Sequence, residues 1–115
     1  MTVRLMVMAA RLGGTVALLL GVCWWWGLAV PLHAHMAAGG LLVASLWGLA
    51  LVARGTVRGL ALAGVVVGAL VPLLGMMQLH LNFGAGQAVL HLLHAGSGLA
   101  AITLAEMLGA RLRRR

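Results

Sequence analysis

The chain is organised as four long apolar runs, separated by short stretches that contain arginine, proline or glycine. The runs cover about residues 12–30, 33–53, 59–79 and 88–110. Each has roughly 20 residues, the length at which an α-helix crosses a hydrocarbon core about 30 Å thick. Because the connections are short, consecutive helices must run antiparallel. The pattern predicts an all-α integral membrane protein, an up-down-up-down four-helix bundle that forms one domain over residues 1–115.

The composition supports an apolar exterior. Hydrophobic residues make up 63% of the sequence and charged residues 8%, with a mean hydropathy of +1.12. A water-soluble domain of this size keeps most of its residues near the surface, and this chain has too few polar side chains to cover one. A lipid bilayer accepts apolar side chains on all sides of a helix bundle. We therefore expect the lipid bilayer to be the main partner of the chain.

The charges predict an orientation. The net charge of +7 comes from eight arginines and one acid, Glu106. The arginines lie near the N-terminus, in the 54–58 loop and at the C-terminus, whereas the 31–34 and 81–87 loops carry no charged residue. The positive-inside rule then predicts both termini in the cytoplasm, in a multi-pass protein of a bacterial-type inner membrane. Arginines placed between apolar runs are membrane anchors, so we expect no nucleic-acid partner.

All five histidines fall near the predicted outer face of the membrane. His33 and His35 open the second run, His80 closes the third, and His91 and His94 lie in the first turns of the fourth. Polar and ionisable side chains within membrane helices commonly mark functional sites. The histidines are therefore the candidate chemistry of this chain.

Two of the histidines share a spacing. His35 and Gly39 form H-x-x-x-G on the second run, and His94 and Gly98 form it on the fourth. In each case the glycine lies one helical turn deeper on the face of the histidine, which clears a groove beneath the imidazole. The edge of a porphyrin needs such a groove when the imidazole binds its iron. Because the two helices run in the same direction, we expect His35 and His94 to ligate a b-type haem between them.

The spacing leaves other ligand sets open. His33 lies about 200° around the helix from His35, so only one of the two faces the bundle interior. His91 lies one turn above His94 and is an alternative ligand or a partner for a haem propionate. A copper or zinc site is a further alternative, because tetrahedral zinc accepts three or four imidazoles.

Three short segments carry a resemblance to a known family: His-Ala-His-Met-Ala-Ala-Gly at 33–39, Leu-Gly-Met-Met-Gln at 74–78 and Val-Leu-His-Leu-Leu-His-Ala at 89–95. With these segments the chain resembles one four-helix half of the haem A synthase family. That family has two fused bundles, each with histidines on its second and fourth helices facing one haem site at the outer side. Small b-type membrane cytochromes are similar. The resemblance implies haem b held by His35 and His94.

The chain departs from that family at one position. The catalytic half of the family has a glutamate three residues before the second-helix histidine. Here Leu32 precedes His35 at that spacing, and Val30 precedes His33. The resemblance therefore implies electron transfer or haem handling rather than haem oxidation, and we expect a chain with no catalytic residues that is not an enzyme by itself. Small multidrug-resistance transporters have a similar length, but they use a glutamate in the first helix, which this chain lacks.

A second class of function fits the same sequence. The chain has 17 glycines, including Gly64 and Gly68 in a G-x-x-x-G on the third run. Small residues let helix backbones approach closely in lipid. Such faces, with no soluble domain attached, are also typical of a non-catalytic accessory subunit in a homodimer or a larger membrane complex.

Overall fold

The computed structural model describes residues 1–114, and these form an all-helical bundle. The four helices are α1 (Thr2–Trp25), α2 (Leu32–Ala53), α3 (Arg58–His80) and α4 (Gln87–Arg113). A 3-10 turn, η1 (Gly84–Gly86), precedes α4. All four helices are long and apolar enough to cross a membrane. The predicted all-α class with four candidate membrane spans is confirmed.

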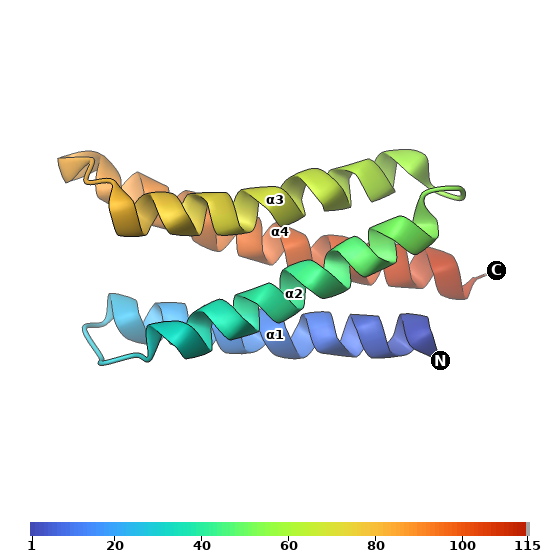
Figure 1. Ribbon diagram of the computed structural model, residues 1–115, viewed down its shortest axis with the longest axis horizontal. Coiled ribbons are helices and arrows are strands. Elements are labelled where there is room, and N and C mark those ends of the chain that lie inside the picture. Colours follow the sequence, from blue (N-terminus) through green and yellow to red (C-terminus); the bar gives the residue numbers. More distant parts are fainter. Residues whose placement is uncertain (115) are drawn as a thin grey trace.

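Successive helices run in opposite directions, so their ends and the connecting loops gather at the two ends of the bundle (Figure 1). The α2–α3 loop lies at the same end as the chain termini, and we call this the arginine end because it carries Arg4, Arg54 and Arg58. The α1–α2 and α3–α4 loops lie at the opposite end, which we call the histidine end. The five histidines all lie in the helical turns near it.

The first helix differs from its predicted bounds. The sequence pattern places it at residues 12–30, whereas α1 runs from Thr2 to Trp25. Arginine is a good helix former, and Arg11 binds Glu106 of α4 through two hydrogen bonds, one of them 2.9 Å from Nη2 to Oε2. At the other end Gly27 has φ +78°, which glycine adopts without a steric penalty, so the chain leaves the helix there.

The bundle is flattened so that two opposite helices touch. α2 contacts α1, α3 and α4, whereas α1 and α3 share no contact within residues 1–114. The backbone extends over 47 × 23 × 16 Å. The direct contact of α2 with α4 is what allows side chains of these two helices to meet inside the bundle.

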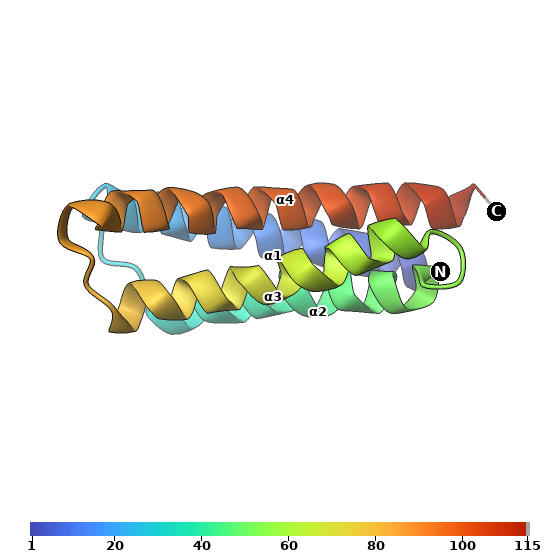
Figure 2. The same ribbon diagram turned by 90° about the horizontal axis from the view of Figure 1, so that it is seen from above.

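Most of the tightly packed side chains lie at the middle of the bundle and in its arginine half. The largest fully buried side chains are Leu42, Leu46, Leu49, Leu108 and Val7. Leu42 lies at the middle of α2, and the other four lie in the parts of their helices nearer the arginine end, where glycines also bring the helices close together. Toward the histidine end few side chains of the described residues are buried, among them Val71 and Leu90, and Figure 2 shows α2 and α3 diverging from α4 in that direction.

Candidate functional site

His35 and His94 lie next to each other inside the bundle. His35 comes from the first turn of α2 and His94 from the second turn of α4, the two opposite helices that touch. Their ring centroids are 6.0 Å apart and the ring planes are tilted by 54°. Both side chains are half-buried. The structure thus brings together one histidine from each H-x-x-x-G pattern.

The orientation of His35 is fixed by a hydrogen bond to α1. Its Nδ1 lies 3.0 Å from the backbone carbonyl oxygen of Ala17. A carbonyl oxygen only accepts, so Nδ1 carries the proton and donates it, which leaves the lone pair of the neutral ring on Nε2. Metal-binding histidines typically donate their second ring N–H in this way. Nε2 of His35 is therefore the atom available to a ligand.

His94 has a different environment. Its Nδ1 is buried and has no hydrogen-bond partner. Its ring lies against Gly75 of α3, where a Cβ would come within 3.1 Å of Cε1 and 3.7 Å of both ring nitrogens. A buried polar atom without a partner costs free energy, so native proteins rarely leave one unexplained. A ligand held by this ring is one explanation.

The glycines of the two patterns border open space. A Cβ added to Gly39 would meet no atom within 4 Å, and one added to Gly98 would meet only Leu18 Cδ2, at 4.0 Å. No protein side chain therefore fills these positions one turn below His35 and His94.

The other three histidines do not join the pair. The ring of His91 contacts Trp24 edge-on, with centroids 5.3 Å apart, and Trp25 at 6.1 Å. His33 and His80 are exposed. One turn of α4 is thus enough to direct His91 toward the tryptophans of α1, whereas His94 faces α2 and α3.

The number of protein side chains available as ligands distinguishes a zinc site from a haem iron. Within residues 1–114, no group of three or more histidine, cysteine or acidic side chains is close enough to hold a metal ion. A tetrahedral zinc site needs three or four protein ligands, so the zinc alternative has no support in this part of the chain. A haem iron takes its remaining ligands from the porphyrin and needs only one or two from the protein. The pair of His35 and His94 fits that requirement.

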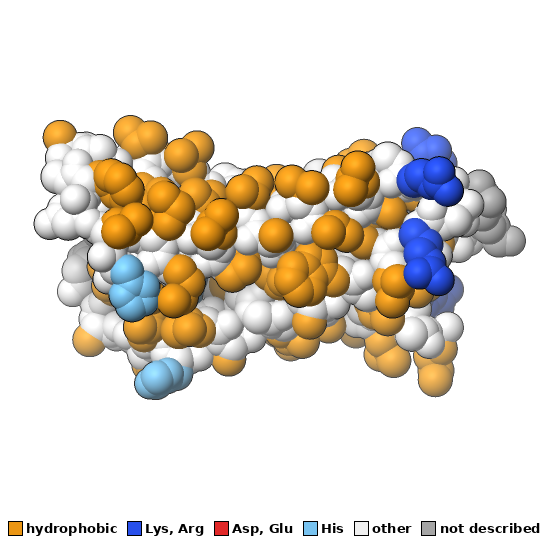
Figure 3. All heavy atoms as spheres, turned by 45° about the horizontal axis from the view of Figure 1, so that its top comes forward, with side chains coloured by type: hydrophobic (Ala, Val, Ile, Leu, Met, Phe, Trp, Pro, Cys, Tyr) orange, Lys and Arg blue, Asp and Glu red, His pale blue; other side chains and the backbone are white. Residues whose placement is uncertain are grey.

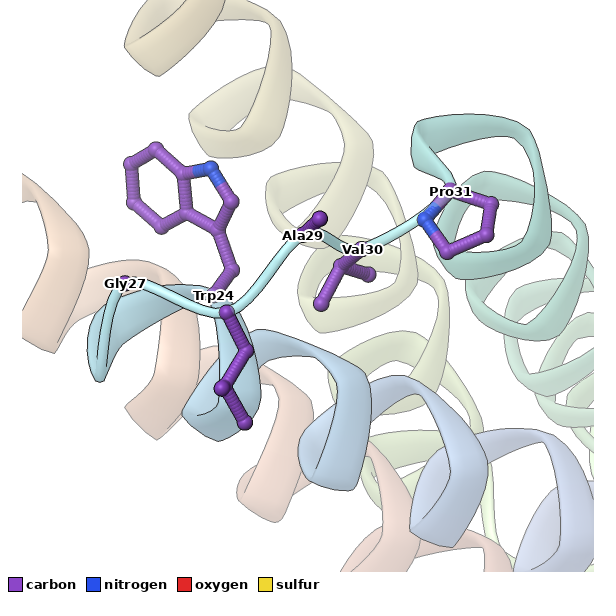
Figure 4. Close-up of a pocket in the computed structure, with 6 residues that line it drawn as sticks. Trp24, Gly27, Ala29, Val30 and Pro31 are labelled. Carbon is purple, nitrogen blue, oxygen red and sulfur yellow. The ribbon is translucent and has the colours of Figure 1, made fainter.

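Two surface depressions lie in the loops of the histidine end, not between His35 and His94. The larger, of about 560 Å³, is lined by Trp24 and by residues 27–31 of the α1–α2 loop (Figure 4). The smaller lies beside the α3–α4 connection, where Gln87 Nε2 donates to the carbonyl oxygen of Gln78 at 3.3 Å. Trp24 and Gln87 thus contribute to these loop surfaces.

Sequence reasoning missed two contacts of the site. Gly75 of α3 was not recognised as the residue against which the His94 ring lies, although a glycine inside an apolar helix is a signal of close packing. The hydrogen bond from His35 to Ala17 has no sequence signal of its own, because its acceptor is a backbone carbonyl.

Comparisons of the chain with protein-family models, curated proteins and solved structures found no match. The resemblance to the haem A synthase family therefore remains an interpretation of three short segments. A function must be argued from the residues themselves.

Proposed function

We propose that this chain is a membrane haem b-binding protein in which His35 and His94 are the two axial ligands, serving electron transfer or haem handling. The observation that carries the proposal is the half-buried pair of imidazoles, 6.0 Å apart, contributed by opposite helices. Two imidazoles that bind one ion from opposite sides, at about 2.0–2.1 Å each, have ring centroids about 6 Å apart. The pair has the separation that such ligation requires.

The surroundings of the two rings favour ligation, and for His35 they define the ligating atom. Ala17 holds the proton on Nδ1 of His35 and leaves Nε2 free. Gly75 gives the ring of His94 room on α3, and Nδ1 of that ring, although close to the Val71 backbone, makes no hydrogen bond of normal geometry. Neutral imidazole nitrogens are the form that binds a metal. Both residues are thus prepared to act as ligands before any cofactor arrives.

The histidine half of the bundle can admit a flat group at small cost. Each Å² of apolar surface exposed costs about 25 cal/mol in water, and still less in lipid, where apolar side chains remain among apolar neighbours. Since Val71 and Leu90 are the buried side chains of the described residues toward this end, separating the helices there breaks few contacts. The packed arginine half keeps the four helices associated while the helices separate at the histidine end.

The haem, when bound, supplies a one-electron redox centre. His35 and His94 then occupy both axial positions, which leaves no open site for a substrate and favours electron transfer over substrate chemistry. The lack of an acid near the pair agrees with this, because the one acidic residue, Glu106, is bound to Arg11 in the arginine half.

The charge distribution supports an orientation for this centre. With the arginine end in the cytoplasm, as the positive-inside rule requires, the histidine pair lies toward the outer face of a bacterial-type inner membrane. Trp24, Trp25 and Trp26 then lie at the outer interface, where tryptophan is enriched, and all three are exposed. Electrons would therefore enter or leave on the outer side.

The absorbance spectrum of protein purified from cells supplied with haem precursor tests the proposal. We expect a Soret band and the sharp visible bands of low-spin, six-coordinate haem b, with iron confirmed by elemental analysis. His35→Ala and His94→Ala should each abolish the low-spin spectrum. His33→Ala and His80→Ala are matched controls, because both residues are exposed histidines of the same end, and they should keep it.

Other results of these experiments would favour an accessory subunit or a different histidine ligand. A wild-type protein that folds but shows no Soret band would refute haem binding. Stoichiometric co-purification with other membrane proteins and no bound metal would then favour an accessory subunit. A low-spin spectrum retained by His94→Ala but lost by His91→Ala would move the ligand one turn along α4.

A further inference from the structure

The arginine end carries a dense positive patch that the haem proposal does not use. Figure 3 shows arginine side chains gathered at one end of the bundle and histidines near the other. Within residues 1–114, the arginines of this end come from the ends of all four helices and are exposed. The members of this patch are Arg4, Arg54, Arg58, Arg111, Arg113 and Arg114.

Within the sequence, almost nothing balances this charge. Glu106 is the only acidic side chain of the chain, and Arg11 already binds both of its carboxylate oxygens. The formal net charge of the chain is +7. A patch of this kind attracts anions, and the anions must come from outside the chain.

The length of the helices fixes the depth of the patch. α2 has 22 residues and α3 has 23. At 1.5 Å per residue these helices are only a few Å longer than a hydrocarbon core of about 30 Å. Arg54, which caps α2, and Arg58, which begins α3, therefore lie at the level of the lipid headgroups. Lipid phosphates are the anions present at that depth.

Arginine is also the side chain best suited to phosphate. Its planar guanidinium keeps its charge and donates two parallel hydrogen bonds to one phosphate group. The chain uses arginine at every basic position and contains no lysine. We propose that the arginine end binds the headgroups of anionic phospholipids in the leaflet that it faces. This inference does not depend on haem.

Reconstitution in lipid nanodiscs tests it. The full chain is placed in phosphatidylcholine discs with or without a minor fraction of phosphatidylglycerol, and retained lipids are counted by native mass spectrometry after extraction. We expect preferential retention of phosphatidylglycerol, a higher Tm in its presence, and a decline of both effects as salt is added. Because one arginine near a membrane surface contributes about a fivefold preference, the double variant Arg54→Gln/Arg58→Gln should lose about tenfold or more.

The matched control carries two substitutions at the opposite end. His33→Gln/His80→Gln replaces two exposed polar residues and should keep the wild-type lipid preference. Equal retention of both lipids by the wild type, or full preference in Arg54→Gln/Arg58→Gln, would overturn the proposal. Displacement of the lipid by a short DNA duplex or by free glycerol phosphate, at equal phosphate concentration, would also overturn the proposal. If the double variant does not fold, Arg114→Gln and the salt titration of the wild type decide the question.

Discussion

Replacing Gly39 by alanine separates a packing role from a cofactor role. In the structure, a Cβ at this position would meet no atom within 4 Å. In the protein without cofactor, Gly39→Ala should therefore be tolerated, and it gains helix propensity of about 0.8–1.0 kcal/mol relative to glycine. We expect the Tm of the cofactor-free variant to equal or exceed that of the wild type.

The same methyl group has the opposite effect if a porphyrin edge lies below His35. Overpacking of this kind costs about 1–3 kcal/mol. Since each 1.4 kcal/mol corresponds to a factor of ten, haem affinity should fall about 5- to 150-fold. Titration of cofactor-free protein with haem, followed at the Soret band, measures the change directly.

Gly40→Ala is the matched control for this experiment. Gly40 is the next residue of α2, it too has no atom within 4 Å of an added Cβ, and it lies about 100° around the helix from Gly39. It should bind haem as the wild type does. If Gly39→Ala and Gly40→Ala bind haem with equal affinity, the groove beneath His35 is not where the porphyrin lies, and the reasoning from H-x-x-x-G fails.

Three further substitutions follow from the packing. Gly75→Ala would place a Cβ 3.1 Å from Cε1 of His94, so we expect a shifted ring, seen as an altered low-spin signal in electron paramagnetic resonance and as weaker haem retention. Gly68→Ala would place a Cβ against the indole of Trp47, so Tm should fall by the equivalent of about 1–3 kcal/mol. Leu46→Ala would empty a site that is 0% exposed and cost about 2–5 kcal/mol in a reversible unfolding assay.

Each of these three substitutions has a matched control variant. Gly21→Ala matches Gly75→Ala, because its Cβ would lie at an ordinary 3.6 Å from Cε1 of His35, and an equal change in both variants would contradict the argument. Gly59→Ala matches Gly68→Ala, since nothing lies within 4 Å of its added Cβ, and its Tm should not fall. For Leu46→Ala the control is Leu62→Ala, whose side chain is 64% exposed and which should lose much less stability.

The number of helices was predictable because lipid imposes a length on every apolar run. The start of α1 was not predictable in the same way. Arg11 is compatible with a helix interior because Glu106 binds it, and these two residues are 95 positions apart in the sequence. A local pattern contains no information about such a partner, so the arginine was interpreted as a flank of the helix.

The candidate site was predictable only in part, for a similar reason. Helical periodicity is a local property, and it predicted that His35 and His94 lie at one depth. The partners of each ring depend on neighbouring helices. The ring of His35 reaches the carbonyl of Ala17 on α1, and no pattern within α2 indicates that acceptor. His91 contacts the tryptophans of α1 for reasons of helix rotation that spacing within α4 does not determine.

The arginine half and the histidine half of the bundle differ in how tightly their side chains are packed. Apolar side chains gain little from leaving lipid for the protein interior, so membrane helices associate through close contact between well-fitted surfaces. Here such contact is concentrated around Leu46, Leu49 and Leu108 in the arginine half. Stability supplied there does not require a tightly packed histidine half, which therefore retains two half-buried imidazoles and open space beside Gly39. Substitutions in the arginine half should change stability, and those around the histidine pair should change ligand binding.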